Sequence, residues 1–248
     1  MAEKNDPITP MMRQYKETKE KYPDAILFYR LGDFYEMFFE DAKLASSLLQ
    51  IVLTKRGSKG ASGTGVEVPM CGIPYHSALN YITKLIKLGY KVAICEQVED
   101  PKLAKGLVKR EVVKLITPGT VLEDSILSRK SNNFLAAVFI SGKKAGLAFA
   151  DVSTGEFLVS EIPGEENRDR ILEELSRFNP AELLLPSSFE ISEPRLVNSL
   201  KESKALLNFI EDYYFDRISA EKSLKKHFKV GSLEGFGLAG MEAAIPAA

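Results

Sequence analysis

Residues 31–39 read LGDFYEMFF, a stretch in which a Gly-Asp turn signal and one carboxylate interrupt large apolar side chains. The run before it, AILFYRL (25–31), is rich in strand-favouring residues. A strand, then Gly32-Asp33, then a second apolar run predicts two strands joined by a tight turn. Burying an unpaired carboxylate is costly, so the direction in which Glu36 points decides what this region can do.

Phe34 and Glu36 are two residues apart, and in an extended chain such residues point to the same face. The pattern leaves two arrangements open. In one, Phe34 is a core residue and Glu36 is a solvated charge at the rim, as the usual burial of Phe favours. In the other, Tyr35 is buried, and Phe34 and Glu36 together form an outward face.

The composition is that of an ordinary globular chain, with 45% hydrophobic and 27% charged residues among 248. This length suits one large domain or two of ordinary size. No run approaches the apolar length of a membrane span, and the N-terminal MAEKNDPITP lacks a signal-peptide core. Two cysteines without CxxC spacing and two histidines make a Cys/His metal site unexpected and favour a reduced, cytoplasmic compartment.

Charge is divided unevenly along the chain. Residues 1–115 hold 18 Lys and Arg against 14 Asp and Glu, a net of +4. Residues 116–248 hold 15 against 20, a net of −5. The first part is therefore the one suited to approach a polyanion.

The order of helical and strand-like patterns over residues 1–115 predicts an α/β domain with a mixed sheet. A helix is expected to start at Thr9-Pro10, because Thr is a good N-cap and Pro suits the first helical position. The other expected elements are a helix over 40–50, a strand over 51–57, a Gly/Ser-rich loop over 58–65, an extended segment over 68–77, a helix over 78–90, and strands over 91–98 and 110–117. The apolar face expected for the helix over 78–90 consists of Leu79, Ile82, Leu85, Ile86 and Leu88.

Residues 116–131 are expected to form a linker, and residues 132–248 an RNase H-like α/β domain. Three strand-like runs over 133–162 are joined by short turns, which is typical of a β-meander. Alternating elements follow: a helix over 166–178, a strand over 181–186, a short helix over 193–202, a strand over 205–210 and a helix over 216–228. The end, GMEAAIPAA (240–248), is interpreted as the start of a helix or a shortened linker, so the chain is expected to be a fragment.

Motifs for common catalytic chemistry are absent. The sequence has no P-loop, no G-x-G-x-x-G after a strand and no G-x-S-x-G. An RNase H-like nuclease needs carboxylates clustered around two metal ions. The first strand of the meander has none, and Asp151 and Glu182 are scattered over two other strands. We therefore expect a nuclease-like fold without an active site, although a nuclease remains an alternative.

Five motifs occur in series in the first half: GDFYEMF (32–38), LTKRG (53–57), VPMCGIPYH (68–76), GYKVAICEQ (89–97) and VKLITPGT (113–120). In their order and spacing they resemble the bacterial MutS family of DNA mismatch-recognition proteins. The similarity is continuous over 9–120 and continues in register through 146–157 and 233–238. It implies that the first domain reads mismatches and that the second is a connector domain.

The resemblance also implies roles for individual residues. The family's Phe-x-Glu motif matches Phe34 and Glu36, so Phe34 is expected to wedge beside a mispaired or unpaired base and Glu36 to hydrogen-bond that base. A base ring nitrogen without hydrogen accepts, so Glu36 would need a proton to donate to it. Arg56 is expected to contact DNA. Lys55 is either a further phosphate contact or a solvated strand end, and Met70 is a candidate to pack beside the wedge.

The family's ATPase and dimerisation regions are expected outside this sequence, with ATP and Mg²⁺. The fragment itself is expected to be a monomeric, non-enzymatic binding module. The expected partners are mismatched double-stranded DNA and a MutL-like protein, the latter through the connector, with no membrane contact. The expected location is the bacterial cytoplasm, at the nucleoid. A DNA-independent interaction scaffold remains the second alternative.

Overall fold

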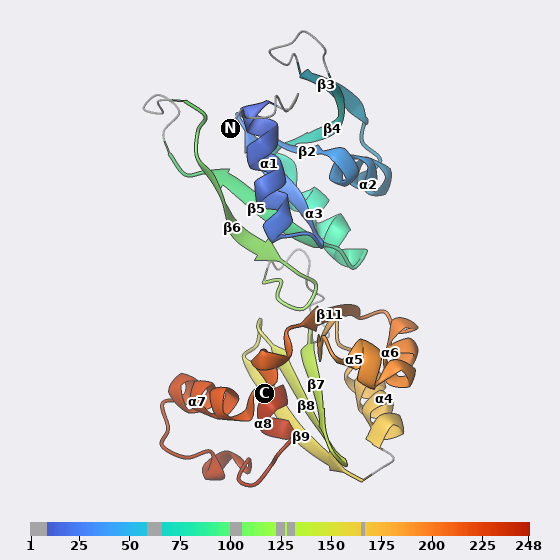
Figure 1. Ribbon diagram of the computed structural model, residues 1–248, viewed down its shortest axis with the longest axis vertical. Helices are drawn as coiled ribbons and strands as arrows, with labels where there is room; N and C mark the ends of the chain where they lie inside the picture. Colours follow the sequence, from blue (N-terminus) through green and yellow to red (C-terminus); the bar gives the residue numbers. More distant parts are fainter. Residues whose placement is uncertain (1–8, 59–65, 100–105, 123–126, 128–131, 165–166) are drawn as a thin grey trace, which may run out of the picture. The chain divides into compact units, whose positions relative to one another are not determined.

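The computed structural model describes residues 9–58, 66–99, 106–122, 127, 132–164 and 167–248. The chain divides into two compact units, Met1–Thr117 and Pro118–Ala248 (Figure 1). The predicted loop over 58–65 lies outside the described residues except for Ser58. Of the linker predicted over 116–131, residues 123–126 and 128–131 lie outside them as well.

The first unit is built on a mixed sheet with the strand order β3-β4-β2-β1-β5-β6 among the described residues. The pair β1–β5 is parallel and the other pairs are antiparallel. The predicted mixed-sheet α/β class is confirmed. The elements are α1 (Pro10–Lys21), β1 (Ala25–Leu31), β2 (Phe34–Phe38), α2 (Phe39–Leu49), β3 (Thr54–Ser58), β4 (Val66–Pro74), η1 (Tyr75–Ser77), α3 (Ala78–Lys87), β5 (Lys91–Gln97) and β6 (Arg110–Ile116).

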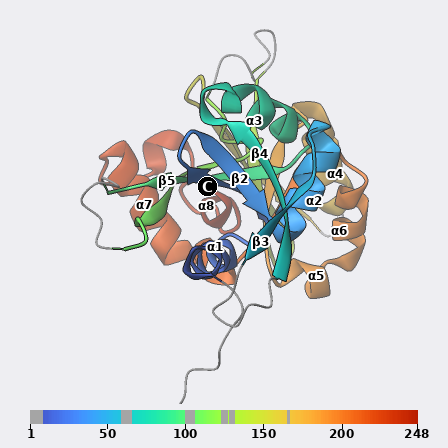
Figure 2. The ribbon, with the colours of Figure 1, turned by 90° about the horizontal axis from the view of Figure 1, so that it is seen from above.

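Helix α1 covers one face of this sheet. It begins as predicted, with the Thr9 side chain accepting a hydrogen bond from the Met12 amide at 3.4 Å and Pro10 in the first turn. Met12 and Tyr15 are almost fully buried, and the Tyr15 ring meets the Phe38 ring edge-on at 5.1 Å. Helix α3 packs near β5 on the side of the strands away from α1 (Figure 2).

Two details predicted for the first unit are corrected by the structure. The strand predicted over 51–57 begins at Thr54, because α2 ends in a left-handed residue, Gln50, after which the chain needs connecting residues to reach the sheet edge. The apolar face predicted for the helix over 78–90 is only partly right. Ile82, Leu85 and Ile86 are buried as predicted, together with Ala78, but Leu79 and Leu88 are exposed, because the neighbours of α3 cover only that narrower stripe.

The second unit has the sheet order β11-β10-β7-β8-β9 among the described residues. Strands β7, β8 and β9 form the antiparallel meander, and β10 and β11 run parallel to β7. An antiparallel meander followed by alternating helices and strands is the arrangement predicted for this unit, with two short helices where one was expected. The elements are β7 (Leu135–Ser141), β8 (Lys144–Asp151), β9 (Glu156–Pro163), α4 (Asn167–Phe178), β10 (Glu182–Pro186), α5 (Phe189–Ser192), α6 (Pro194–Lys201), β11 (Leu206–Ile210), η2 (Asp212–Phe215), α7 (Arg217–Phe228), η3 (Glu234–Phe236) and α8 (Ala244–Ala247).

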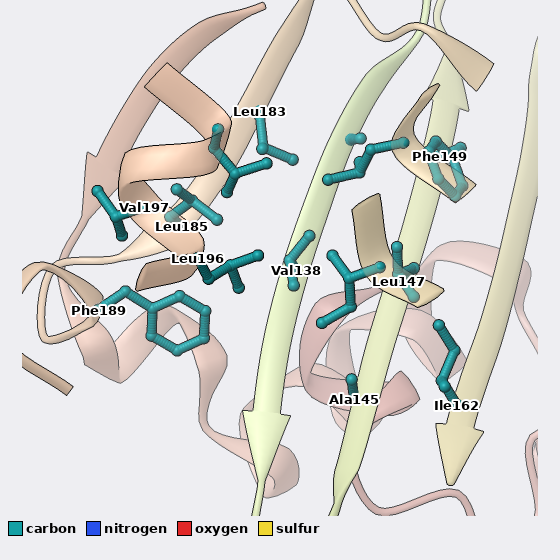
Figure 3. Packing of buried hydrophobic residues seen from close by; sticks show 14 of the residues in the cluster. Val138, Ala145, Leu147, Phe149, Ile162, Leu183, Leu185, Phe189, Leu196 and Val197 are labelled. Atoms are coloured by element: carbon teal, nitrogen blue, oxygen red, sulfur yellow. The ribbon is translucent and has the colours of Figure 1, made fainter. Parts of the chain in front are cut away.

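The two faces of this second sheet carry different layers. On one face, Leu183 and Leu185 of β10 and Val138 of β7 join a core that includes Leu196 and Val197 of α6 (Figure 3). On the other, residues 243–247 pack against β8. Gly146 permits this approach, since a Cβ atom there would lie 1.9 Å from the Ala243 carbonyl oxygen. The last residues are therefore a buried part of this unit.

Candidate nucleic-acid interface

The predicted turn is a two-residue connection between β1 and β2. Leu31 pairs with Phe34, and Gly32 takes a positive φ of 56°, which glycine adopts without strain. The turn is tied to its neighbours, because the Asp33 carbonyl accepts from the Tyr75 amide at 2.9 Å. The turn and this hydrogen bond together set where β2 starts, and therefore where Phe34 lies.

The register of β2, β3 and β4 shows which side chains share a face. Glu36 lies opposite Gly72, Phe38 opposite Met70, and Val68 opposite Arg56. Directly paired residues, and residues two apart on one strand, point to the same side of a sheet. Phe34, Glu36, Phe38, Arg56 and Met70 therefore share one face, which we call the α1 face because α1 packs on it.

Helix α1 covers the α1 face unevenly. Phe38 is fully buried under Tyr15, whereas Phe34 is 47% exposed at the other end of β2. Tyr35, on the opposite face, is 7% exposed. Of the two arrangements that the pattern left open, this is the outward one, with an uncovered aromatic ring beside a carboxylate.

Glu36 is paired with Arg56. Arg56 Nη1 donates to Glu36 Oε2 at 2.6 Å, and the guanidinium carbon lies 6.0 Å from the centre of the Phe38 ring. The contact crosses over β4, the strand that lies between β2 and β3. Met70, half-buried on β4, packs against the same cluster as Phe38. The structure thus brings four of the five predicted site residues onto one face.

Lys55 is the exception. It pairs in register with Pro69, so it points to the opposite face from Arg56. There its ammonium lies 2.7 Å from the Glu67 carboxylate, whose hydrogen bond raises the pKa of Lys55. Sequence reasoning left Lys55 open between a phosphate contact and a solvated strand end. Adjacent residues of a strand face opposite ways, so Lys55 does not share a face with Arg56.

Several groups buried on the two sides of this sheet are held in neutral form by burial. Burial, and then a hydrogen bond to Glu96, raises the pKa of Tyr35 to about 12. Burial also raises the pKa of the Cys71 thiol to about 11 and that of Cys95 to about 12. Both cysteines are buried, so neither is poised as a nucleophile at neutral pH.

The second unit uses its carboxylates for structure. Asp151 accepts from the Asn133, Ser153 and Thr154 amides and from the Ser153 hydroxyl. Burial by itself would raise the pKa of Asp151, but these hydrogen bonds outweigh it and lower the pKa. Glu182 accepts from the Gly119 amide at 3.1 Å.

The register also separates these two carboxylates. Leu135 pairs with both Ala150 and Glu182, so Glu182 shares a face with Ala150 and Asp151 points to the other. Among the described residues, no three His, Cys, Asp or Glu side chains come together in a way that could hold a metal ion. Nor does any helix in the described ranges have the length and apolar character needed to cross a membrane.

Comparison with known proteins covers nearly the whole chain. Residues 9–125 match the family model for MutS domain I, and residues 133–248 match that for MutS domain II. Two proteins named DNA mismatch repair protein MutS, from Syntrophomonas wolfei and Syntrophobacter fumaroxidans, are 50% and 53% identical over 97% of this chain. The chain spans 28% and 26% of their lengths. The chain therefore belongs to the MutS family, of which it contains domains I and II.

Proposed function

We propose that this chain recognises mismatched or unpaired bases in duplex DNA through the exposed end of the α1 face. The observation that carries the proposal is the 47% exposure of Phe34, beside Glu36, at the tip of a tightly held hairpin. An apolar ring at the end of a rigid element is suited to enter a base step.

Selectivity follows from the mechanics of DNA. A wedge partly unstacks and kinks the duplex, at a cost of a few kcal/mol. A mismatched or looped base is already weakly held, so opening beside it costs less than opening a paired step. Stacking of Phe34 on a base returns about 1–3 kcal/mol for any base type. Phe34 thereby detects deformability, and Glu36 adds a polar contact to the displaced base.

The test compares the binding of mismatched and matched duplexes by the full-length protein, with and without the substitution Phe34→Ala. Removing the ring should cost about 1–3 kcal/mol of affinity for the mismatch and little for matched DNA. Phe236→Ala is a matched control, because Phe236 is a 54% exposed phenylalanine of the second unit. Intact mismatch preference after Phe34→Ala would favour the alternative, a DNA-independent scaffold.

We further propose that this chain has no catalytic activity of its own. Support comes from Asp151 and Glu182, the carboxylates considered for a two-metal nuclease site, because they lie on opposite faces of their sheet. Incubating labelled DNA with this chain in Mg²⁺ or Mn²⁺ should leave the DNA uncut, and metal-dependent cleavage would instead support the nuclease alternative.

The remaining proposals rest on family membership. ATP and Mg²⁺ binding and stable homodimerisation belong to regions of the full-length protein outside this sequence, and this chain alone is a monomer. The second unit is the docking site for a MutL-like partner. The protein acts in the bacterial cytoplasm, at the nucleoid.

A further inference from the structure

The Arg56–Glu36 ion pair joins two strands that do not pair with each other. β4 lies between β2 and β3, so the Arg56 side chain reaches over it to bind Glu36. The Glu36 side chain is 17% exposed and that of Arg56 is 43% exposed. The guanidinium is therefore the outer partner, which covers the carboxylate from solvent.

This arrangement addresses an electrostatic problem of the proposed interface. A carboxylate close to a duplex repels the phosphates whatever the base sequence, and the repulsion acts before any base is reached. A guanidinium at hydrogen-bonding distance cancels that charge locally and fixes the carboxylate in one place.

We propose that Arg56 is a positioning residue for Glu36. Its guanidinium neutralises and orients the carboxylate, so that Glu36 can approach a base without repelling the DNA backbone. The inference rests on the proposed function and deepens it: Arg56 acts through Glu36, not as an independent phosphate contact. An independent contact would lose the same affinity whether or not residue 36 carried a charge.

A double-mutant cycle in the full-length protein tests this difference. Affinities for one mismatched and one matched duplex are measured for the unaltered protein, Glu36→Gln, Arg56→Gln and the double variant. Arg56→Gln alone leaves an uncompensated carboxylate. We expect its fold-loss to exceed, by about fivefold or more, the fold-loss it causes when Glu36→Gln is also present. Equal losses in the two backgrounds would overturn the proposal.

Lys55 supplies a matched control. It neighbours Arg56 on β3, and its ion pair with Glu67 lies on the opposite face of the sheet. Lys55→Gln removes the same charge, and its fold-loss should be the same with and without Glu36→Gln. If Lys55 were coupled to Glu36 as strongly as Arg56 is, the coupling would reflect net charge alone, and the proposal would also be overturned.

Two further variants complete the experiment. Arg56→Lys keeps the positive charge and should retain more affinity than Arg56→Gln, whereas equal losses would contradict neutralisation. Phe34→Ala, measured in parallel, tests the proposed function separately. If Phe34→Ala leaves mismatch preference intact while Arg56 and Glu36 remain coupled, the wedge fails and the positioning role stands. Thermal unfolding of each variant shows whether a loss of affinity reflects a loss of fold.

Discussion

Glu36 in the first unit and Asp151 in the second are both carboxylates on sheet strands, but they are held in different ways. Asp151 is 1% exposed and accepts hydrogen bonds from three backbone amides and one hydroxyl. Glu36 is held by the side chain of Arg56 on an open face. A carboxylate tied to the backbone stabilises a turn, while one held by a long side chain can respond to a ligand.

The same contrast extends to two glycines. Gly146 is closed in by the backbone of Ala243, whereas a methyl group at Gly72 would meet Glu36 Cγ at an ordinary 3.5 Å. One position is part of a packed layer and the other belongs to an uncovered surface. The two regions therefore differ in packing as well as in electrostatics, and the predictions below test each difference.

The largest effect is expected from Gly146→Ala. Its methyl group would overlap the Ala243 carbonyl, so residues 243–247 must shift away from β8. The expected loss in the free energy of unfolding is about 3 kcal/mol. Denaturant unfolding measures it, with Gly72→Ala as the control that should lose far less. Similar losses at the two glycines would remove the contrast in packing.

Asp151→Asn should have the next largest effect, a loss of about 2 kcal/mol in the free energy of unfolding. The amide nitrogen that replaces one carboxylate oxygen would face a backbone N–H that also donates. Thermal unfolding at neutral pH measures the loss. Unchanged stability would show that the turn does not depend on this carboxylate.

The dependence of the free energy of unfolding on acidic pH should also change when Asp151 is replaced. Because hydrogen bonds lower its folded pKa, Asp151 contributes stability above its unfolded pKa and loses it as pH falls through the folded value. The difference in stability between the unaltered chain and Asp151→Asn should therefore shrink in acid. Denaturant titrations at several acidic pH values provide the measurement, and a constant difference would contradict the assignment.

The cysteines test how firmly α1 covers its part of the α1 face. Cys95 belongs to the cluster that α1 buries. Burial raises the pKa of Cys95 to about 12, and that of Cys71 from 9.0 to about 11. A pKa raised that far lowers the thiolate fraction at pH 8 about 100-fold or more, so a thiol reagent should modify the folded chain at least that much more slowly than the unfolded one.

The same thiols should make the free energy of unfolding fall at alkaline pH. Their folded pKa values are raised, so their contribution is complete below the unfolded thiol pKa and is lost as pH rises toward 11 and 12. Fast labelling of Cys95 alone in the native chain would mean that α1 lifts from the sheet.

The smallest effect on stability is expected for Glu36→Gln. The pair that it breaks is partly exposed, and such pairs contribute about 0–1 kcal/mol. Thermal unfolding should change by far less than for Asp151→Asn. A large loss would mean that Glu36 is a structural carboxylate, and the comparison with Asp151 would fail.

Sequence reasoning was most reliable where local rules act alone. The cap at Thr9-Pro10, the Gly32 turn and the meander over 133–162 follow from short-range preferences, and each occurs as expected. Reasoning was less reliable where a distant element decides exposure. The stripe predicted for α3 is buried at Ile82, Leu85 and Ile86, but how far the burial extends depends on what the helix packs against, and Leu79 and Leu88 are left exposed.

The candidate site divides in the same way. Strand alternation alone determined that Phe34 and Glu36 point together and Tyr35 points away. The tertiary structure decided that α1 covers Phe38 but leaves Phe34 open, and that Arg56 reaches Glu36 across β4 while Lys55 faces away. The physical reason is range: side-chain alternation is a property of one strand, whereas burial and ion pairing depend on register between strands that are distant in sequence.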